Sequence, residues 1–156
     1  MKQLFACALF LITSLAAVSA QSVEANPPAD KKKSTQTEAS ENEARAAAEA
    51  LANKYDLNAD QAKQVYAVQQ RKLRNLSEIE PLKAEKRNIY LSKLESLQQG
   101  TLTSLRKILR TKEQIALYAQ TQKDMRIKRA EKRKEMMLEK ASKEDIQAAM
   151  LDIYEE

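Results

Sequence analysis

The stretch Leu57–Gln69, with the sequence LNADQAKQVYAVQ, predicts the start of a helix that has a second, altered copy later in the chain. Asn58 precedes Gln61 by three residues, and an apolar run follows. This spacing is that of a capping box, in which the Asn side chain accepts from the third backbone N–H and the Gln side chain reaches back to the N–H of the cap. Thr111 and Gln114 repeat the spacing 53 residues later. The sequence therefore predicts two helices that begin in the same way.

Residues 1–20 have the pattern of a cleavable export signal. Lys2 precedes an apolar segment at 4–12, and the small-residue triplet VSA at 18–20 precedes Gln21. A membrane anchor is the alternative, but the apolar-biased segment has roughly 15 to 17 residues and a spanning helix needs about 20. We expect a periplasmic protein that is cleaved near Ala20 and has no stable membrane insertion afterwards.

The chain beyond this signal lacks most side chains used in catalysis and metal binding. Cys7, the one cysteine, lies in the signal, and the sequence has no His. This composition excludes a disulfide scaffold, a Cys nucleophile, a His-based triad and a His or Cys metal site. Gly100 is the one glycine, which excludes a Gly-rich phosphate loop. A pair of catalytic carboxylates remains open, but no motif marks one. We expect no enzyme activity, no cofactor and no metal.

Hydrophobic spacing divides the rest of the chain into three parts. Residues 21–40 are polar, contain two prolines and show no apolar periodicity, so we expect a disordered linker. Residues 41–140 show helical spacing and form the main domain. Residues 141–156 carry a net charge of −4 and predict an acidic helix or tail. No segment alternates as a strand does, so the predicted fold is all-α with no β-sheet.

Two residues interrupt the helical spacing of the main domain. Pro81 either kinks one long helix from Asn58 to Leu97 or ends it. We favour the kink, because helical spacing resumes without a glycine or a turn sequence. Gly100 suits a helix end, so we expect a break at 98–101 and a short helix at 102–109.

A basic segment, residues 123–134, begins where the apolar stripe of the last long helix ends. It carries seven basic and two acidic side chains, and two methionines follow at once. Such a mixture can attract a partner by charge and then hold it by adaptable apolar contact. The alternative is a solvated helix face with Met136 and Met137 in the core. The candidate binding residues are Lys123, Met125, Arg126, Lys128, Arg129, Lys132, Arg133, Lys134, Met136 and Met137.

Long helices with a single apolar stripe each cannot build a thick core. We therefore expect long, kinked helices in a thin array, and a homodimer in which exposed stripes meet.

The pentapeptide LNADQ resembles the LTxxQ motif of the Spy/CpxP family, periplasmic all-helical proteins in which the motif occurs twice. The segment ILRTKEQ resembles the second copy, and the resemblance covers roughly residues 44–134. Asn58 stands where the family usually has Thr, and Arg110 displaces the leucine of the second copy by one position. We assign six motif residues to helix ends and packing: Leu57, Asn58, Gln61, Leu109, Thr111 and Gln114.

The resemblance implies an ATP-independent chaperone, or a stress-response regulator, built as a cradle-shaped dimer that holds unfolded clients on its concave face. Its partners are then unfolded client proteins or a periplasmic regulator. The main alternative is a structural or regulatory envelope protein, such as a modulator of a periplasmic stress sensor, without general client binding. The export signal argues against nucleic acid, although the basic segment would suit it. Some relatives of this family are metal sensors, so the resemblance also suggests that role. The only metal ligands that this chain could supply are carboxylates and methionines. A trimeric chaperone like Skp is a further alternative, but it would need a strand-rich body for oligomerisation, and this sequence predicts no strands. We also hypothesise that residues 141–156 fold back over the basic segment.

Overall fold

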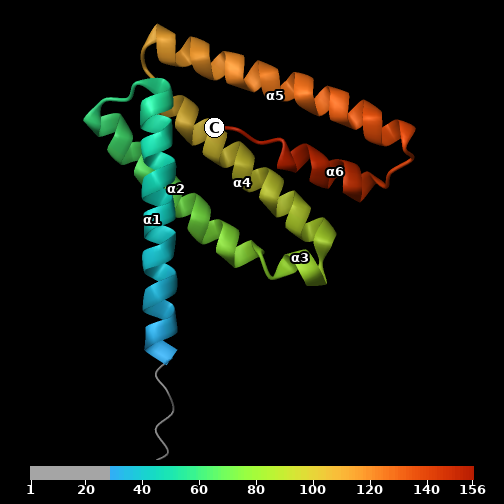
Figure 1. Ribbon diagram of the computed structural model, residues 1–156, viewed down its shortest axis with the longest axis horizontal. Coiled ribbons are helices and arrows are strands. Elements are labelled where there is room, and N and C mark those ends of the chain that lie inside the picture. The colour runs from blue at the N-terminus through green and yellow to red at the C-terminus, as the bar shows by residue number, and fades with distance from the viewer. Residues whose placement is uncertain (1–28) are drawn as a thin grey trace, which may run out of the picture.

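The computed structural model describes residues 29–156, with side chains from residue 38 onward, so the expected signal at 1–20 and the linker residues 21–28 lie outside it. The described chain forms six helices and no strand, which confirms the all-α prediction (Figure 1). No helix in this range is both long and apolar enough to span a membrane. The helices are α1 (Ala29–Tyr55), α2 (Ala59–Ile79), α3 (Leu82–Glu85), α4 (Arg87–Ile108), α5 (Lys112–Leu138) and α6 (Lys143–Asp152).

Helix α1 begins earlier than the sequence indicated. It starts at Ala29, so residues 29–40, which we expected in a disordered linker, are helical. The alanine-rich stretch that follows has a high intrinsic helix propensity, and the helix extends from it toward the N-terminus. Among the side chains described, from residue 38 onward, the first that this helix buries is that of Ala44.

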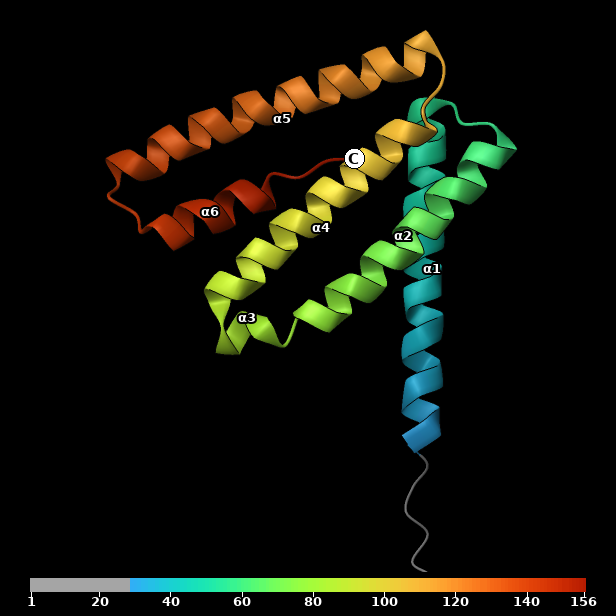
Figure 2. The ribbon, with the colours of Figure 1, turned by 180° about the vertical axis from the view of Figure 1, so that it is seen from behind.

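Helices α2 and α4 form a hairpin and lie side by side (Figures 1 and 2). The prediction of one kinked helix from Asn58 to Leu97 is therefore wrong. Pro81 has no N–H with which to continue α2, and Lys86 leaves the helical region at φ −144° and ψ 65°. The reversal brings Tyr90 and Leu91 of α4 into contact with Ile79 at the end of α2. Burial of these side chains favours the hairpin over a long exposed helix.

The expected break at 98–101 is also wrong, because α4 continues through Gly100 without a positive φ. A glycine inside a helix costs about 1 kcal/mol relative to alanine. The cost is offset because α4 buries residues on both sides of the glycine, including Leu91, Leu102 and Leu105. The segment that we expected as a separate short helix at 102–109 is the last part of α4.

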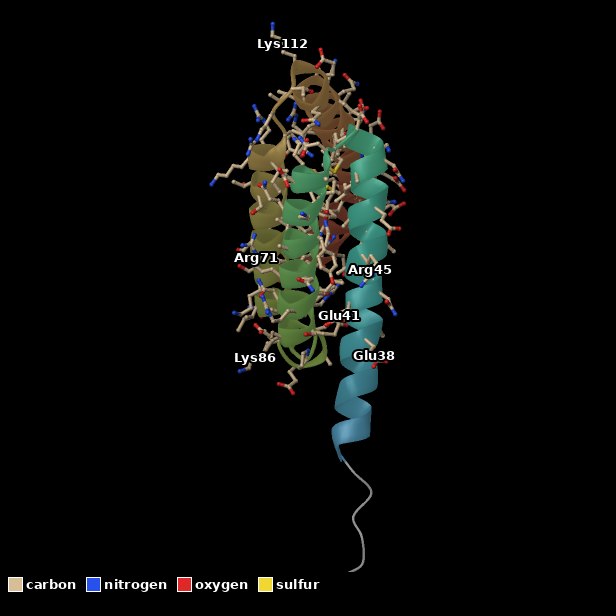
Figure 3. The ribbon with its side chains drawn as sticks, turned by 90° about the vertical axis from the view of Figure 1, so that its left-hand side faces the viewer. Glu38, Glu41, Arg45, Arg71, Lys86 and Lys112 are labelled. Carbon is tan, nitrogen blue, oxygen red and sulfur yellow. The ribbon has the colours of Figure 1, made fainter. Side chains whose placement is uncertain are left out.

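Two apolar clusters hold the helices together. The larger lies where α1, α2, α4 and α5 meet, and the smaller joins α4, the α2–α3 turn and α6. The larger cluster contains Ala48, Leu51, Tyr55, Val65, Leu105, Ile108 and Leu109. The smaller contains Tyr90, Leu91 and Leu151. Seen from the side in Figure 3, the helices form a narrow array, in agreement with the expected thin arrangement. Lys112 lies at the top of the array and Lys86 at the lower end of the α2–α4 hairpin, while α1 extends further down.

Candidate functional site

Both predicted capping boxes are present. The Gln61 main-chain N–H donates to Asn58 Oδ1 at 3.0 Å, and the Asn58 N–H donates to Gln61 Oε1 at 3.1 Å. The Gln114 N–H donates to Thr111 Oγ1 at 3.2 Å, and the Thr111 N–H donates to Gln114 Oε1 at 3.3 Å. These four residues, the helix-start junction, therefore begin α2 and α5 in the same way.

The two glutamines of the junction also bind each other. Gln61 Nε2 donates to Gln114 Oε1 at 3.0 Å, and Gln114 Nε2 donates to Gln61 Oε1 at 3.2 Å. The same amide groups donate to main-chain oxygens of Ile108, at 2.8 Å, and Asp56, at 3.1 Å. Gln61 is only 3% exposed, and a buried amide is stable only when its hydrogen bonds are made. The junction thus links the ends of α1 and α4 to the starts of α2 and α5.

The sequence identified each glutamine as part of a cap but did not predict that they meet. The only indication in the sequence was that the two glutamines occupy matching positions in the two motifs, and this does not predict how close they lie in the fold. The leucines of the motifs also find partners, since Leu109 is buried in the larger cluster and Leu57 packs against it. The extra residue Arg110 therefore does not remove Leu109 from the core.

The basic segment has an inner and an outer side. Met125 is 2% exposed and its Sδ accepts the main-chain N–H of Glu155 at 2.9 Å, so it belongs to the core and offers no surface to a client. Arg129 is half-buried and its Nε donates to the main-chain oxygen of Ile153 at 2.9 Å. Met136 is half-buried, whereas Met137 is 64% exposed. The other candidates lie as follows: Lys132 is half-buried, and Lys123, Arg126, Lys128, Arg133 and Lys134 are exposed.

Three arginines of this segment, Arg126, Arg129 and Arg133, line a groove between α4, α5 and α6. The groove has a volume of about 340 Å³, and its apolar lining includes Leu102 and Met150. It adjoins a second hollow of about 450 Å³ along α5 and α6, with which it shares Arg133 and Met150. We call the two together the arginine groove. Its other lining residues are Glu95, Gln98, Gln99, Ala130, Met137, Lys143, Ile146, Gln147 and Leu151.

Polar contacts fix α6, which forms one wall of the groove. Ser142 caps the helix by accepting the Asp145 N–H, and Arg87 at the start of α4 pairs with Asp145 at 2.8 Å. The hydrogen bond from Ser142 and the nearby Arg87 guanidinium hold the pKa of Asp145 below its usual range. Gln98 Nε2 of α4 donates to the main-chain oxygen of Leu151 at 3.0 Å. The wall is therefore attached to α4 at both ends of α6.

The chemistry of this groove suits binding. Guanidinium groups donate paired hydrogen bonds to carboxylates, and methionine side chains adapt to apolar surfaces of irregular shape. Among residues 38–156, no group of three or more acidic side chains is arranged to hold a metal ion. The pKa of Lys132 is raised, chiefly by its hydrogen bond to Glu135.

The fold and the groove together define a small all-α protein with an open groove that has a basic and apolar lining. Comparisons with protein-family models, with curated proteins and with solved structures found no match for this chain. The resemblance to the Spy/CpxP family therefore depends on the two motifs at the helix-start junction.

Proposed function

We propose that this protein is an exported, ATP-independent chaperone-like protein that holds unfolded protein segments in the arginine groove and performs no catalysis. The observation that carries the proposal is the placement of three guanidinium groups beside an apolar lining. An unfolded segment exposes apolar side chains together with carboxylates, and this groove offers a partner for each.

The spacing of the arginines supports the proposal. Arg126, Arg129 and Arg133 are three and four residues apart, so they project from one side of α5. Among the described residues, none of the three forms an ion pair within the chain. The charges of Arg126 and Arg133, whose side chains are exposed, are therefore available to a partner, whereas Arg129 already donates to the main-chain oxygen of Ile153. By contrast, an arginine that already held a carboxylate would have to give it up before it could bind a client.

The open shape of the groove favours weak and general binding. It extends from the α4–α5 contact to the end of α5, so an extended segment of several residues fits along it at about 3.3 Å per residue. An unfolded segment loses conformational freedom when it is bound, which lowers the net affinity. A holding protein needs such reversible binding to release its client for folding.

A homodimer in the periplasm completes the proposal. The side of α5 that faces away from the core exposes Ile127, and Leu138 at its end is 76% exposed. Exposed apolar side chains of this kind are commonly covered by association with a second copy. The resemblance to the Spy/CpxP family agrees with this arrangement. The alternative function, a regulator that binds one periplasmic partner, would use the same groove with a single ligand.

The test is suppression of aggregation of a denatured model protein without ATP. Arg126→Gln, Arg129→Gln and Arg133→Gln together should raise the concentration needed for half-suppression about tenfold, for a loss of about 1.4 kcal/mol of binding free energy. The matched control carries Lys63→Gln, Arg74→Gln and Lys107→Gln, which remove the same charge from exposed positions outside the groove. This control should act like the wild type.

Two results would count against the proposal. Equal weakening in both triple variants would show that net charge matters and that the groove does not. Failure of the wild type to suppress aggregation, with its helix content intact by circular dichroism, would favour the regulatory function.

A further inference from the structure

Residues 153–156, which we call the strap, leave α6 and run back beneath α5 toward the middle of the molecule (Figure 1). Two main-chain contacts hold this segment to α5. Arg129 Nε donates to the Ile153 oxygen at 2.9 Å, and the Glu155 N–H donates to Met125 Sδ at 2.9 Å. The strap thus lies against the inner side of the basic segment. The hypothesis that residues 141–156 fold back over that segment rests on their opposite charges, whereas these two contacts are made by main-chain atoms of the strap.

The acidic side chains of the strap bind α1 and α2. Lys54 of α1 donates to Glu155 Oε1 at 2.7 Å and to the main-chain oxygen of Glu156 at 2.6 Å. Lys72 and Gln69 of α2 both donate to the carboxylate of Glu156. The strap therefore connects three helices through polar contacts.

Tyr154 of the strap also has specific partners. Its hydroxyl donates to Glu156 Oε1 at 2.9 Å, and Lys72 Nζ lies 5.1 Å from the centre of its ring. An ammonium at that distance is attracted by the face of an aromatic ring. Burial and the neighbouring Glu156 carboxylate raise the pKa of Tyr154, so it remains a neutral hydrogen-bond donor.

The surface beneath the strap has the properties of a peptide site. Gln69 is only 1% exposed, and its amide donates to the strap. Lys54 and Lys72 approach from different helices, and Ala47 and Leu51 supply apolar surface beside them. These residues line a shallow hollow of which the strap itself forms one wall. Without the strap, the Gln69 amide would lose this hydrogen bond at a buried position, which is unfavourable unless another ligand replaces it.

We propose that the strap is an internal ligand, and that the cleft formed on α1 and α2 when the strap leaves binds external protein segments in which an aromatic residue is followed by acidic residues. This site differs from the arginine groove and does not depend on the function proposed above. Departure of the strap breaks the exposed Lys54–Glu155 pair at little cost. The buried contacts of Glu156 with Lys72 and Gln69 are costlier to lose, and an external segment with an acidic residue at that place would restore them. While bound, it lowers the apparent affinity for an external segment by occupying the same cleft.

The experiment measures binding of a fluorescent peptide, DIYEE with both ends capped, to the full chain. A variant with Glu155→Gln and Glu156→Gln weakens the strap and should bind the peptide at least tenfold more tightly than the wild type. The control has Glu139→Gln and Glu144→Gln, which make the same charge change at exposed positions outside the cleft. Its affinity should equal that of the wild type. Equal affinity in all three chains would overturn the proposal.

A third substitution locates the peptide. Lys72→Gln in the weakened-strap variant should remove the tenfold gain, and a retained gain would contradict the assignment. The Arg126→Gln and Arg133→Gln double variant should bind the peptide as the wild type does. Loss of peptide binding in that double variant would place the peptide in the arginine groove and overturn this inference. If the double variant still binds the peptide but the wild type does not suppress aggregation, only the function proposed above is overturned.

A measurement on the unaltered chain guards against misfolded variants. Saturating peptide should displace the strap and speed hydrogen exchange of the Glu155 N–H, which is bonded to Met125 in the free protein. A control peptide with Ala for Tyr and Gln for both Glu should leave that exchange unchanged. Unchanged exchange with the DIYEE peptide bound would also overturn the proposal.

Discussion

The helix-start junction and the basic segment lie at opposite ends of α5 and differ in how they are held. At the junction, α1, α2, α4 and α5 meet around buried glutamines with complete hydrogen bonding. Beyond Met125, α5 is supported by α6 and the strap and exposes most of its charged side chains. One helix thus fixes the fold with its first half and exposes the proposed binding surface on its second. Substitutions at the two ends should separate stability from binding.

The largest effect is expected from Gln61→Ala. This change removes four hydrogen bonds at a buried position and leaves Gln114 without its partner, so the free energy of unfolding should fall by about 3–4 kcal/mol. Urea unfolding followed by circular dichroism measures this difference. Gln64→Ala, at an exposed position of the same helix, should change stability by less than about 0.5 kcal/mol. Similar losses in both variants would mean that the junction does not stabilise the fold.

The next largest effect is expected from a substitution at Met125, where the buried half of α5 ends and the exposed half begins. Met125→Ala should lower the free energy of unfolding by about 2–3 kcal/mol, because the side chain is 2% exposed and its removal leaves a cavity. Ile127→Ala, two residues further on, removes a side chain that is 47% exposed and should cost less than about 1 kcal/mol. The same unfolding assay compares the two. An equal cost would indicate that the outer side of α5 is buried in solution, as in the proposed homodimer, and sedimentation would then test for that dimer.

Local sequence patterns predicted the parts of this fold that depend on neighbouring residues. The capping boxes at Asn58 and Thr111 follow from a spacing of three residues, and the all-α class follows from helical periodicity without alternation. The end of the apolar stripe at Met125 was also visible in the sequence, and in the structure Met125 is the last buried side chain of α5.

The errors arose where contacts between distant residues decide the outcome. Pro81 is compatible with a kink or with a turn, and the packing of α4 against α2 in both apolar clusters selects the hairpin. Gly100 favours a helix end by its own preference, but the buried side chains on either side of it keep α4 intact. The pairing of the two motif glutamines, and hence the position of the groove, also depends on the hairpin.

Gly100→Ala gives a smaller effect of opposite sign and tests the interpretation of α4. A methyl group at this position would meet no atom within 4 Å, and the residue is helical. Alanine should therefore raise the free energy of unfolding by about 0.5–1 kcal/mol. Thermal unfolding measures the change, with aggregation suppression as a second readout that should stay unchanged. A loss of stability would show that α4 is broken at Gly100 in solution.

The smallest effect concerns the strap and depends on pH. The hydrogen bond and charge of Lys54 hold the pKa of Glu155 below its ordinary value, so the folded state favours the ionised carboxylate. The resulting stabilisation is complete above the ordinary pKa of a glutamate and is lost as the pH falls toward the lowered value. Because the pair is partly exposed, Glu155→Gln should cost only about 0.2–1 kcal/mol at pH 7. The wild type and the variant should become equal in urea unfolding once the pH is below the lowered pKa of Glu155, because both side chains are then neutral. A difference between them that does not shrink as the pH falls would mean that Glu155 stabilises the strap by packing instead of by charge.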